Sequence, residues 1–513
     1  MNRISRRGLL RSGAAAGVLS LTGLPVRAQH RGGTLVAGLS GAHSSDSWDS
    51  RTHADIFMIA AGHGCVFDCL TEVAADGTLQ GELAESWEVS ADAKVWTFNL
   101  RRGVTFHSGA SFGADDVIAS LQLHLEEGSN SPVRTVIAAI TEMRKLNDHQ
   151  VQFTLREGNA DFPYLMSDYH LVMYPGGAIV EAMEQGIGTG LYQVESFEPG
   201  ARLTATRVKD HYKGDTAGFF GRIEFVAVTS DADRPTALQS GQVDVIDRVS
   251  PHAVAGISAN KSLRLQEVVG NQHYSLSLRH GTAFDDLNLR KALKHGINRT
   301  EMVEQVLLGH GEVGNDTPIG PMNQYFNASL AQLEFDPDKA RHFLAKAGLD
   351  SLSLTLSTSD TAFSGAGEAA DLFRSSAAMA GIDINIVEEA TDGYWADAWL
   401  QSSFATGHWS GRATEDWMLS TAYADGAAWG DGGMQSQARF QDLLLKARAE
   451  LDSEKRQDDY YEMQEILRDE GSTLIPMFAN FLQATHKGIE TPETIGSLWP
   501  MDNARMAERW SRA

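Results

Sequence analysis

The spacing of apolar and polar residues along the chain predicts a mixed α/β protein. Apolar residues at alternate positions predict strands at residues 33–38, 96–100, 151–155, 203–208, 223–228 and 274–278. Apolar residues three or four positions apart predict helices at residues 55–70, 115–125, 289–308 and 438–470, the last with a break near Asp452. A strand at 353–357, a helix at 368–380 and a strand at 383–388 form a predicted βαβ unit.

Length and composition are those of an ordinary globular protein with an acidic surface. The 513 residues are 42% hydrophobic and 21% charged, and the formal net charge is −24. At roughly 150 residues per domain the length predicts two to four domains, although no repeat or low-complexity linker marks their limits. Because phosphate binding relies on clustered Lys and Arg, this charge argues against nucleic acid as a partner. No apolar run reaches the roughly 18 residues that a membrane-spanning helix needs.

The two cysteines are too few to form a disulfide framework. Cys65 and Cys69 are four residues apart in the predicted helix 55–70, so their side chains run along one helical face and suit a disulfide poorly. We interpret them as buried, reduced thiols.

The first 28 residues resemble a twin-arginine export signal. Residues 5–11 read Ser-Arg-Arg-Gly-Leu-Leu-Arg, a weakly apolar stretch follows at 13–24, and Ala28 precedes a predicted cleavage at Gln29. The segment contains five arginines and no acidic residue, so its removal makes the net charge more negative still. No cysteine follows the cleavage region, which argues against a lipoprotein anchor. We therefore expect passage through the Tat translocase and a free protein in the periplasm.

Enzyme motifs are absent or incomplete. The chain has no Walker loop, no H-E-x-x-H and no G-x-S-x-G. Residues 365–370 match G-x-G-x-x-A, but seven residues separate them from the preceding predicted strand, and a dinucleotide site needs the first glycine directly after the strand. The seventeen histidines form no H-x-H or H-x₃-H pair. We therefore expect no cofactor, no metal ligand set and no enzyme, with an exported cofactor-dependent enzyme as the alternative.

An ordered series of motifs spans most of the chain. It comprises Gly-Glu-Leu-Ala-Glu-Ser-Trp at 81–87, the stretch 96–109 ending in Phe-His-Ser-Gly, Gly-Thr-Gly-Leu-Tyr at 188–192, Ala-Leu-Gln-Ser-Gly-Gln-Val-Asp at 237–244, residues 289–299, Asp-Pro-Asp-Lys-Ala at 336–340 and Ile-Pro-Met-Phe at 475–478. Together they resemble the extracytoplasmic solute-binding proteins of ABC transporters that take up dipeptides, oligopeptides or nickel (family 5).

This resemblance implies a two-lobed α/β periplasmic-binding-protein fold with a ligand cleft between lobes joined by two hinge strands. We expect one lobe at residues 29–273, with an extra subdomain at about 76–185, a second lobe at 274–479, and a return to the first at 480–513. The crossings are expected near 273–278 and 475–483. The resemblance further implies a monomer that captures a small molecule and delivers it to the permease subunits of an ABC importer.

The loop at residues 408–416 resembles the family's W-x-G-x-x-x-D-P-D loop, whose first Asp pairs with the ligand's α-amino group in dipeptide binders. Here Thr414, Glu415 and Asp416 replace Asp-Pro-Asp. One hypothesis is that Glu415 or Asp416 beside Trp409 holds a cationic or zwitterionic solute such as a peptide or another amine. The alternative is that both acids cap the helix that follows.

Further candidate ligand-binding residues come from three segments. His43 and Ser45 lie in a polar loop from which this family commonly contacts ligand, and His273 and Tyr274 lead into the first expected crossing. His408 and Arg412 belong to the loop around Trp409. His408 could also ligate a metal chelate of the nickel type.

Overall fold

The computed structural model describes residues 31–513 except 391–392, 400, 428–433 and 435–436. The predicted export signal lies outside the described residues. Within the described part of the chain, no helix combines the length and apolarity needed to cross a bilayer.

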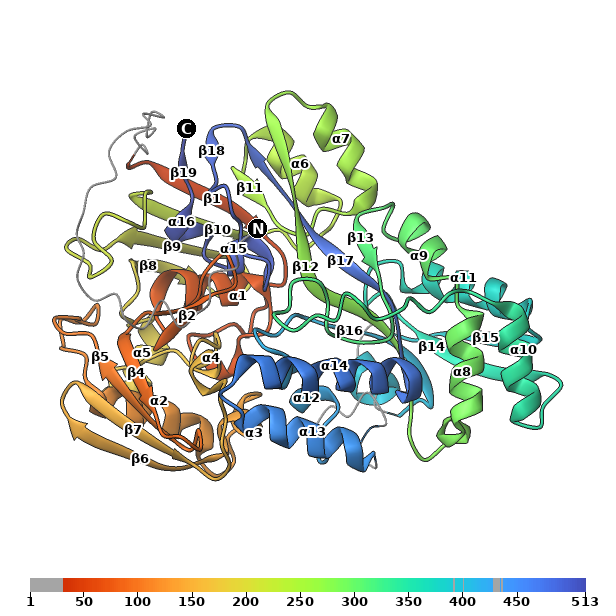
Figure 1. The fold of residues 1–513 in the computed structure, drawn as a ribbon. Helices are drawn as coiled ribbons and strands as arrows, with labels where there is room; N and C mark the ends of the chain where they lie inside the picture. Colours follow the sequence, from red (N-terminus) through yellow and green to blue (C-terminus); the bar gives the residue numbers. More distant parts are fainter. Residues whose placement is uncertain (1–30, 391–392, 400, 428–433, 435–436) are drawn as a thin grey trace, which may run out of the picture.

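A mixed eleven-stranded sheet runs through both lobes (Figure 1). Its order is β15-β14-β16-β12-β17-β11-β1-β10-β9-β8, and β13 pairs with β17 beside this path. The strands on the first-lobe side are β1 (Thr34–Leu39), β8 (Tyr192–Glu198), β9 (Arg202–Arg207), β10 (Arg222–Ala227) and β11 (Val245–Ile246). Those on the second-lobe side are β13 (Gly311–Val313), β14 (Leu352–Thr358), β15 (Ile382–Glu388) and β16 (Phe404–Trp409). The predicted strands at 33–38, 203–208 and 223–228 are confirmed.

Two long antiparallel strands join the lobes: β12 (Leu263–Leu278) and β17 (Thr473–His486). One half of this ladder pairs with β11, and the other half pairs with β16 and β13. The ladder shifts register between Val268 and Gln272. A side chain at Gly270, within this shift, would lie 2.9 Å from the Ala479 carbonyl oxygen, so glycine allows the close approach of the two strands. The strand predicted at 274–278 is therefore only the end of a much longer one.

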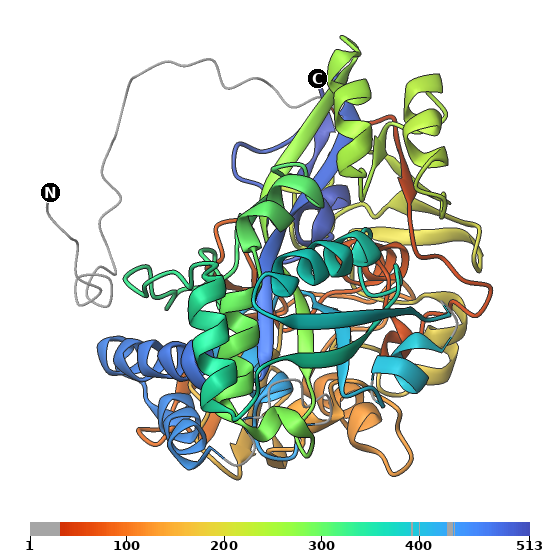
Figure 2. The same ribbon diagram turned by 90° about the vertical axis from the view of Figure 1, so that its right-hand side faces the viewer.

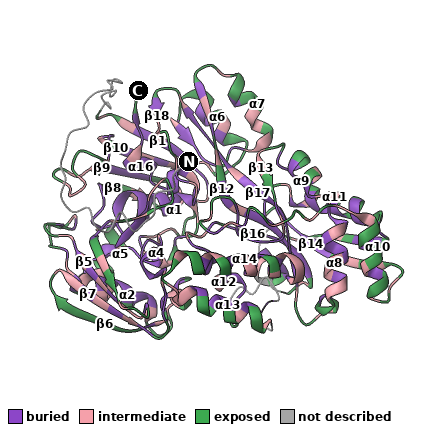
Figure 3. Ribbon diagram, in the orientation of Figure 1, coloured by how far each residue is buried: buried purple, intermediate pink, exposed green. Residues whose placement is uncertain are grey.

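The first lobe is completed by the last residues of the chain. Helices α1 (Ile56–Ala61), α5 (Ile179–Gln185), α6 (Asp233–Ser240), α7 (Val254–Ala259), α15 (Pro500–Asn503) and α16 (Met506–Arg509) surround its strands, with the short pairs β2 (Thr71–Val73) and β3 (Leu79–Gly81), and β18 (Ile489–Glu490) and β19 (Ser511–Arg512). Trp510 is fully buried in the same hydrophobic cluster as Leu35 and Phe225. Figure 3 shows this buried interior and the exposed outer faces of the helices.

A small antiparallel sheet, β4-β5-β7-β6, forms a subdomain within the first lobe. Its strands are β4 (Ala84–Val89), β5 (Val95–Leu100), β6 (Ile140–Asn147) and β7 (Gln150–Leu155), and its helices are α2 (Ala114–Leu125), α3 (Arg134–Ile137) and α4 (Phe162–Leu165). Alternate residues of β5 and β7 are buried, as their sequence pattern requires. The predicted strands at 96–100 and 151–155 and the helix at 115–125 are confirmed.

The second lobe contains the predicted βαβ unit. Strands β14 and β15 are parallel neighbours joined by α11 (Ala366–Ala378), and Figure 2 shows them in teal at the front of this lobe. The other helices are α8 (Leu287–Gly296), α9 (Arg299–Gln305), α10 (Pro337–Lys346), α12 (Glu415–Ala422), α13 (Ala438–Ala449) and α14 (Ser453–Glu470). Asp452 caps α14 at the predicted break, because its carboxylate accepts the Glu454 N–H. The single helix predicted at 289–308 is two helices, divided at Asn298, which caps α9.

The helix predicted at 55–70 is wrong beyond its middle. After α1 the backbone forms a five-residue π-helix (Gly62–Val66) and leaves helical geometry at Phe67. Gly64 lies so close to the Ala504 carbonyl that the last segment of the chain fills the space that a side chain at position 64 would need. Cys69 is therefore not on a helical face with Cys65. Both are free, buried thiols whose pKa is raised by burial.

Candidate functional site

Four of the candidate residues meet on two neighbouring strands beside the register shift. In the antiparallel ladder of β12 and β16, His273 lies opposite Trp409 and Tyr274 lies opposite His408. The loop after β16 is held to the same place, because the Asn271 side-chain amide donates to the Arg412 carbonyl at 3.1 Å. Residues 271–274 and 408–412 thus form one surface where the two lobes join.

His273 is completely buried, yet neither of its ring nitrogens has a hydrogen-bond partner. Its ring centroid lies 5.5 Å from that of Phe478. Burial, with smaller effects from His408 and Arg412, lowers the pKa of His273 to about 3. The imidazole is therefore neutral near pH 7, with one donor and one acceptor nitrogen unused.

Tyr274 and His408 point toward a different set of neighbours. The Tyr274 ring stacks on Phe363 with centroids 4.1 Å apart. His408 lies edge-on to Trp395 at 5.4 Å and bonds to the Ala362 carbonyl, while its Nδ1 is buried without a partner. Burial, with smaller effects from Arg248 and Arg412, lowers the pKa of His408 to about 4. His408 is also neutral near pH 7.

Trp409 is more deeply placed than a residue that only covers a ligand. It is 7% exposed and belongs to the hydrophobic cluster of the second lobe. Its burial means that it contributes to the packing of the lobe as well as to the surface beside His273.

Arg248 is a site residue that the sequence gave no reason to select. It follows β11 with φ +43°, a left-handed conformation unusual for a residue with a side chain. The buried Arg234 donates to the carbonyls of Asp247 and Arg248 and so fixes this turn. The adjacent Val249 N–H donates to the Leu482 carbonyl of β17 at 2.7 Å. These long-range contacts, together with the pairing of β11 with β1 and β17, bring Arg248 to the junction of the lobes.

The polar loop of the first lobe contains the candidate residues His43 and Ser45. His43 is exposed, and its Nε2 lies 3.0 Å from Oδ2 of Asp55. Burial raises the pKa of Asp55, and Arg248 and His43 oppose this rise. Ser45 is exposed, and nothing in the described residues places it against the second lobe. Asp55 is a second polar group that the sequence did not single out.

Glu415 and Asp416 are both buried and already hold donors from the protein. A Glu415 carboxylate oxygen accepts the Tyr325 N–H at 2.7 Å, and Asp416 accepts from Arg448 Nε at 2.9 Å and from the Ser420 hydroxyl. Burial raises the pKa of Glu415 to about 7. The role of either acid toward a solute ammonium remains a prediction, but each carboxylate is engaged without one.

The helix cap assigned to these acids belongs instead to Thr414. Its hydroxyl oxygen accepts the Trp417 N–H at the start of α12. Glu415 and Asp416 occupy the first turn, where a negative charge is favourable at a helix N-terminus, but neither is the capping residue. The expectation that a side chain caps this helix is therefore correct, but the capping residue is Thr414 and not Glu415 or Asp416.

The second lobe contacts the subdomain close to these acids. Arg456 of α14 donates to Oδ2 of Asp161 at 2.6 Å, and the Ala160 N–H donates to the Arg448 carbonyl at 2.7 Å. Trp417 packs within the hydrophobic cluster of the subdomain. The structure is thus one in which α12, α13 and α14 are closed onto the first lobe.

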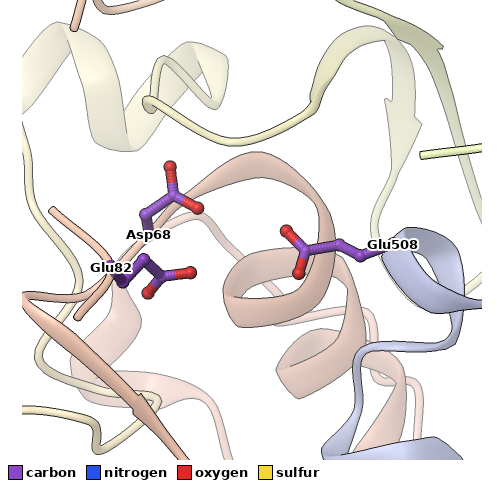
Figure 4. Close-up of side chains that lie close together, drawn as sticks. All are labelled: Asp68, Glu82 and Glu508. Atoms are coloured by element: carbon purple, nitrogen blue, oxygen red, sulfur yellow. The ribbon is translucent and has the colours of Figure 1, made fainter. Parts of the chain in front are cut away.

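Three carboxylates of the first lobe lie near one another, as a metal site would require: Asp68, Glu82 and Glu508 (Figure 4). The Lys213 ammonium lies among them, 2.9, 2.7 and 2.6 Å from one oxygen of each. Arg505 also pairs with Glu82 and Glu508. This buried ion network joins α16 to three loops of the first lobe and already contains its cations.

The family model for "Bacterial extracellular solute-binding proteins, family 5 Middle" matches residues 78–431. The chain is 26% identical over 454 residues to the dipeptide-binding protein of Escherichia coli K12, covering 80% of this chain and 82% of that protein. Its fold is similar to that of AgaA from A. tumefaciens R10 in complex with agropinic acid, with a TM-score of 0.81 and 22% identity over 94% of this chain and 99% of that one. It is also similar to DppA from Helicobacter pylori in complex with the peptide STSA, with a TM-score of 0.80, 22% identity and the same coverage.

Proposed function

Because this chain belongs to the bacterial extracellular solute-binding proteins of family 5, we propose that it captures a small solute between its lobes and delivers it to the membrane subunits of an ABC importer. The observation that carries the proposal is the surface at residues 271–274 and 408–412, which lies where the two lobes join. Family membership favours a binding protein over the exported enzyme that the N-terminal motif leaves open.

The hinge of this mechanism is assigned to β12 and β17. Their register shift at Val268–Gln272 is one of two in this ladder, and bending there breaks few paired hydrogen bonds. On this assignment the lobes comprise about residues 29–273 with 480–513 and residues 274–479. A solute that contacts both lobes stabilises only the closed arrangement, and this difference in affinity shifts the population toward it.

A short peptide is the first class of solute to test, because the E. coli relative is named for dipeptides. The proposed contact residues are His43, His273, Tyr274, His408, Trp409 and Arg412. Export by the twin-arginine pathway and a periplasmic location complete the proposal. Replacing Arg6 and Arg7 by Lys should retain the protein in the cytoplasm if that pathway is used, and normal export of this variant would exclude it.

Solute binding is tested with protein that has been unfolded, freed of bound material and refolded. A thermal-shift panel of dipeptides, their amides, amino acids and opines identifies stabilising compounds, and small-angle scattering measures compaction. A compound at a hundredfold excess over its Kd raises the unfolding free energy by about 2.7 kcal/mol. Binding without a decrease in the radius of gyration would refute closure, and a panel without any hit would refute capture of these solutes.

A further inference from the structure

The second lobe contacts the subdomain of the first lobe through buried charged side chains. Arg456 of α14 donates to Oδ2 of Asp161, which directly precedes α4 of the subdomain. The neighbouring Ala160 N–H donates to the Arg448 carbonyl of α13. Figure 1 shows α13 and α14 next to α3 and α4, away from the two strands that join the lobes. Opening of the lobes about those strands therefore separates these groups.

Three carboxylates but only two guanidinium groups meet at this contact. The carboxylates belong to Asp161, Glu415 and Asp416, and all three residues are buried. Arg456 pairs with Asp161, and Arg448 pairs with Asp416 at 2.9 Å, so each of these two pairs has no net charge. Among the residues that the structure describes, no Lys, Arg or His nitrogen lies within 4 Å of a Glu415 oxygen. Because a buried carboxylate without a cation is costly to ionise, the geometry favours a protonated Glu415.

The groups that face Glu415 come from both lobes. Its carboxylate accepts the Tyr325 N–H at 2.7 Å. Burial raises the pKa of Glu415 to about 7, the Tyr325 N–H and Arg456 oppose the rise, and Asp161 adds to it. Tyr460 of α14 stacks on Tyr325, and burial raises the pKa of the Tyr460 hydroxyl well above 10, so this group is neutral near pH 7.

Opening of the lobes changes which charges surround Glu415. Arg456 and Glu415 belong to the second lobe, whereas Asp161 belongs to the first. In the closed arrangement Asp161 holds the Arg456 guanidinium and also adds a negative charge near Glu415. When Asp161 moves away, Arg456 loses its carboxylate, and the subdomain no longer covers the start of α12, where Trp417 packs against it. Both changes favour an ionised Glu415 in the open arrangement.

We propose that closing the second lobe onto the subdomain binds one proton at Glu415, so that the closed arrangement becomes more favourable as the pH falls from 8 to 6. The proton comes from the solvent and binds the Glu415 oxygen that does not accept the Tyr325 N–H. This inference rests on the proposed function, since it concerns closure of the same two lobes, but it requires no solute. A proton bound only in the closed form stabilises that form as a ligand does.

The size of the effect follows from the pKa of Glu415 in the two arrangements. That pKa is about 7 in the closed form, and an exposed glutamate has an ordinary pKa of 4.5. The stabilisation of the closed form is therefore complete below about pH 4.5 and is lost as the pH rises through about 7. Between pH 6 and pH 8 the ratio of closed to open molecules should fall about tenfold.

Hydrogen exchange at the Ala160 N–H measures this closure, because that group donates across the contact to the Arg448 carbonyl. Solute-free protein is exchanged at pH 6 and pH 8, and each rate is divided by the rate of an unstructured peptide at the same pH. The Leu278 N–H donates to the Ser472 carbonyl within the second lobe and reports unfolding of that lobe. Repeating the exchange in low guanidinium chloride separates opening from unfolding, since unfolding exposes much more surface and accelerates with denaturant.

In the wild type the corrected exchange rate at Ala160 should rise about tenfold from pH 6 to pH 8 and should change little in low denaturant. Glu415→Gln keeps the shape of the protonated acid and should show no such rise. Glu454→Gln is the matched control and should follow the wild type, because this exposed glutamate also lies in the first turn of a helix. Far-UV circular dichroism of each variant confirms that it is folded.

Asp161→Asn provides a second test that does not depend on a folded Glu415→Gln. It frees Arg456 for Glu415 and should remove most of the rise. A corrected rate at Ala160 that is equal at both pH values would overturn the proposal, as would a full tenfold rise in either variant. A rise that accelerates with denaturant together with exchange at Leu278 would assign the proton to folding of the lobe and also overturn it.

Solute capture is tested separately from the proton. A thermal-shift panel without any hit refutes capture of those solutes and leaves a pH-dependent exchange at Ala160 as support for proton-linked closure. A solute that compacts the protein in scattering, combined with exchange at Ala160 that does not depend on pH, refutes the proton link and leaves solute capture intact.

Discussion

Glu415 makes the stability of this protein depend on pH in a predictable direction. Its side chain is 2% exposed, and burial raises its pKa from an ordinary 4.5 to about 7, with Asp161 adding to the rise and the Tyr325 N–H and Arg456 opposing it. Between these two values the folded chain keeps the proton and the unfolded chain loses it. The stabilisation is therefore complete below about pH 4.5 and is lost as pH rises through about 7.

The change Glu415→Gln removes this titration and keeps the shape of the protonated acid. A difference of about 2.5 pKa units at 1.36 kcal/mol per unit corresponds to about 3 kcal/mol. We expect the unfolding free energies of the wild type and the variant to differ by less than about 1 kcal/mol at pH 5, where only part of the stabilisation has been lost. At pH 8 the variant should be more stable by about 3 kcal/mol, because the wild type then buries a charge.

Unfolding both proteins with guanidinium chloride at pH values from 5 to 8 measures this difference in free energy. Taking the difference between the two profiles cancels the contributions of other titrating groups. These include Glu82, whose pKa is also raised by burial, to about 8. Glu304→Gln, at an exposed position of α9, is the matched control and should follow the wild type at every pH. Parallel profiles for the wild type and Glu415→Gln would refute the argument.

Three further outcomes follow from the contacts described above. Lys213→Met leaves three buried carboxylates without their ammonium and should lower the unfolding free energy by about 3–5 kcal/mol, measured by denaturant titration; an unchanged midpoint would mean that Arg505 alone satisfies the acids. Asp161→Asn should weaken the contact of Arg456 with the subdomain, so scattering should give a larger radius of gyration without solute than for the wild type. Trp409→Phe keeps an aromatic group in the core and should still weaken solute binding by about 2 kcal/mol if the indole covers the solute, whereas equal affinity by calorimetry would restrict Trp409 to packing.

Local sequence pattern predicts the regular elements of this fold well. The βαβ unit of β14, α11 and β15, the alternating strands β5 and β7 and the break at Asp452 all follow from signals within a few residues. The prediction of one helix at 55–70 fails because the chain at Gly64 must leave room for the Ala504 carbonyl. That contact joins residues more than four hundred positions apart. The pattern of apolar and polar residues within a short stretch of sequence does not contain such information.

The candidate site shows the same division. His273, Tyr274, His408 and Trp409 could be selected because family motifs and a strand pattern indicate them, and the β12–β16 ladder brings them together. Arg248 has no local signal, since its place depends on the Val249–Leu482 hydrogen bond and on the pairing of β11 with β17. The sequence near the acids at 415 and 416 does not indicate that they are engaged, because their partners, Tyr325 and Arg448, are 90 and 32 residues away.

The pairing of Gln272 with Ala479 has a consequence for the order in which the chain folds. The segment between these residues is continuous and leaves and re-enters the first lobe at neighbouring positions, so topologically it is an insertion. The first lobe, by contrast, requires β17 and the buried Trp510 and Glu508 near the end of the chain. Domains usually complete folding in the order of synthesis. Here all residues of the inserted lobe are synthesised before the last residues of the first lobe. The first lobe, whose synthesis begins earlier, is therefore the one completed last.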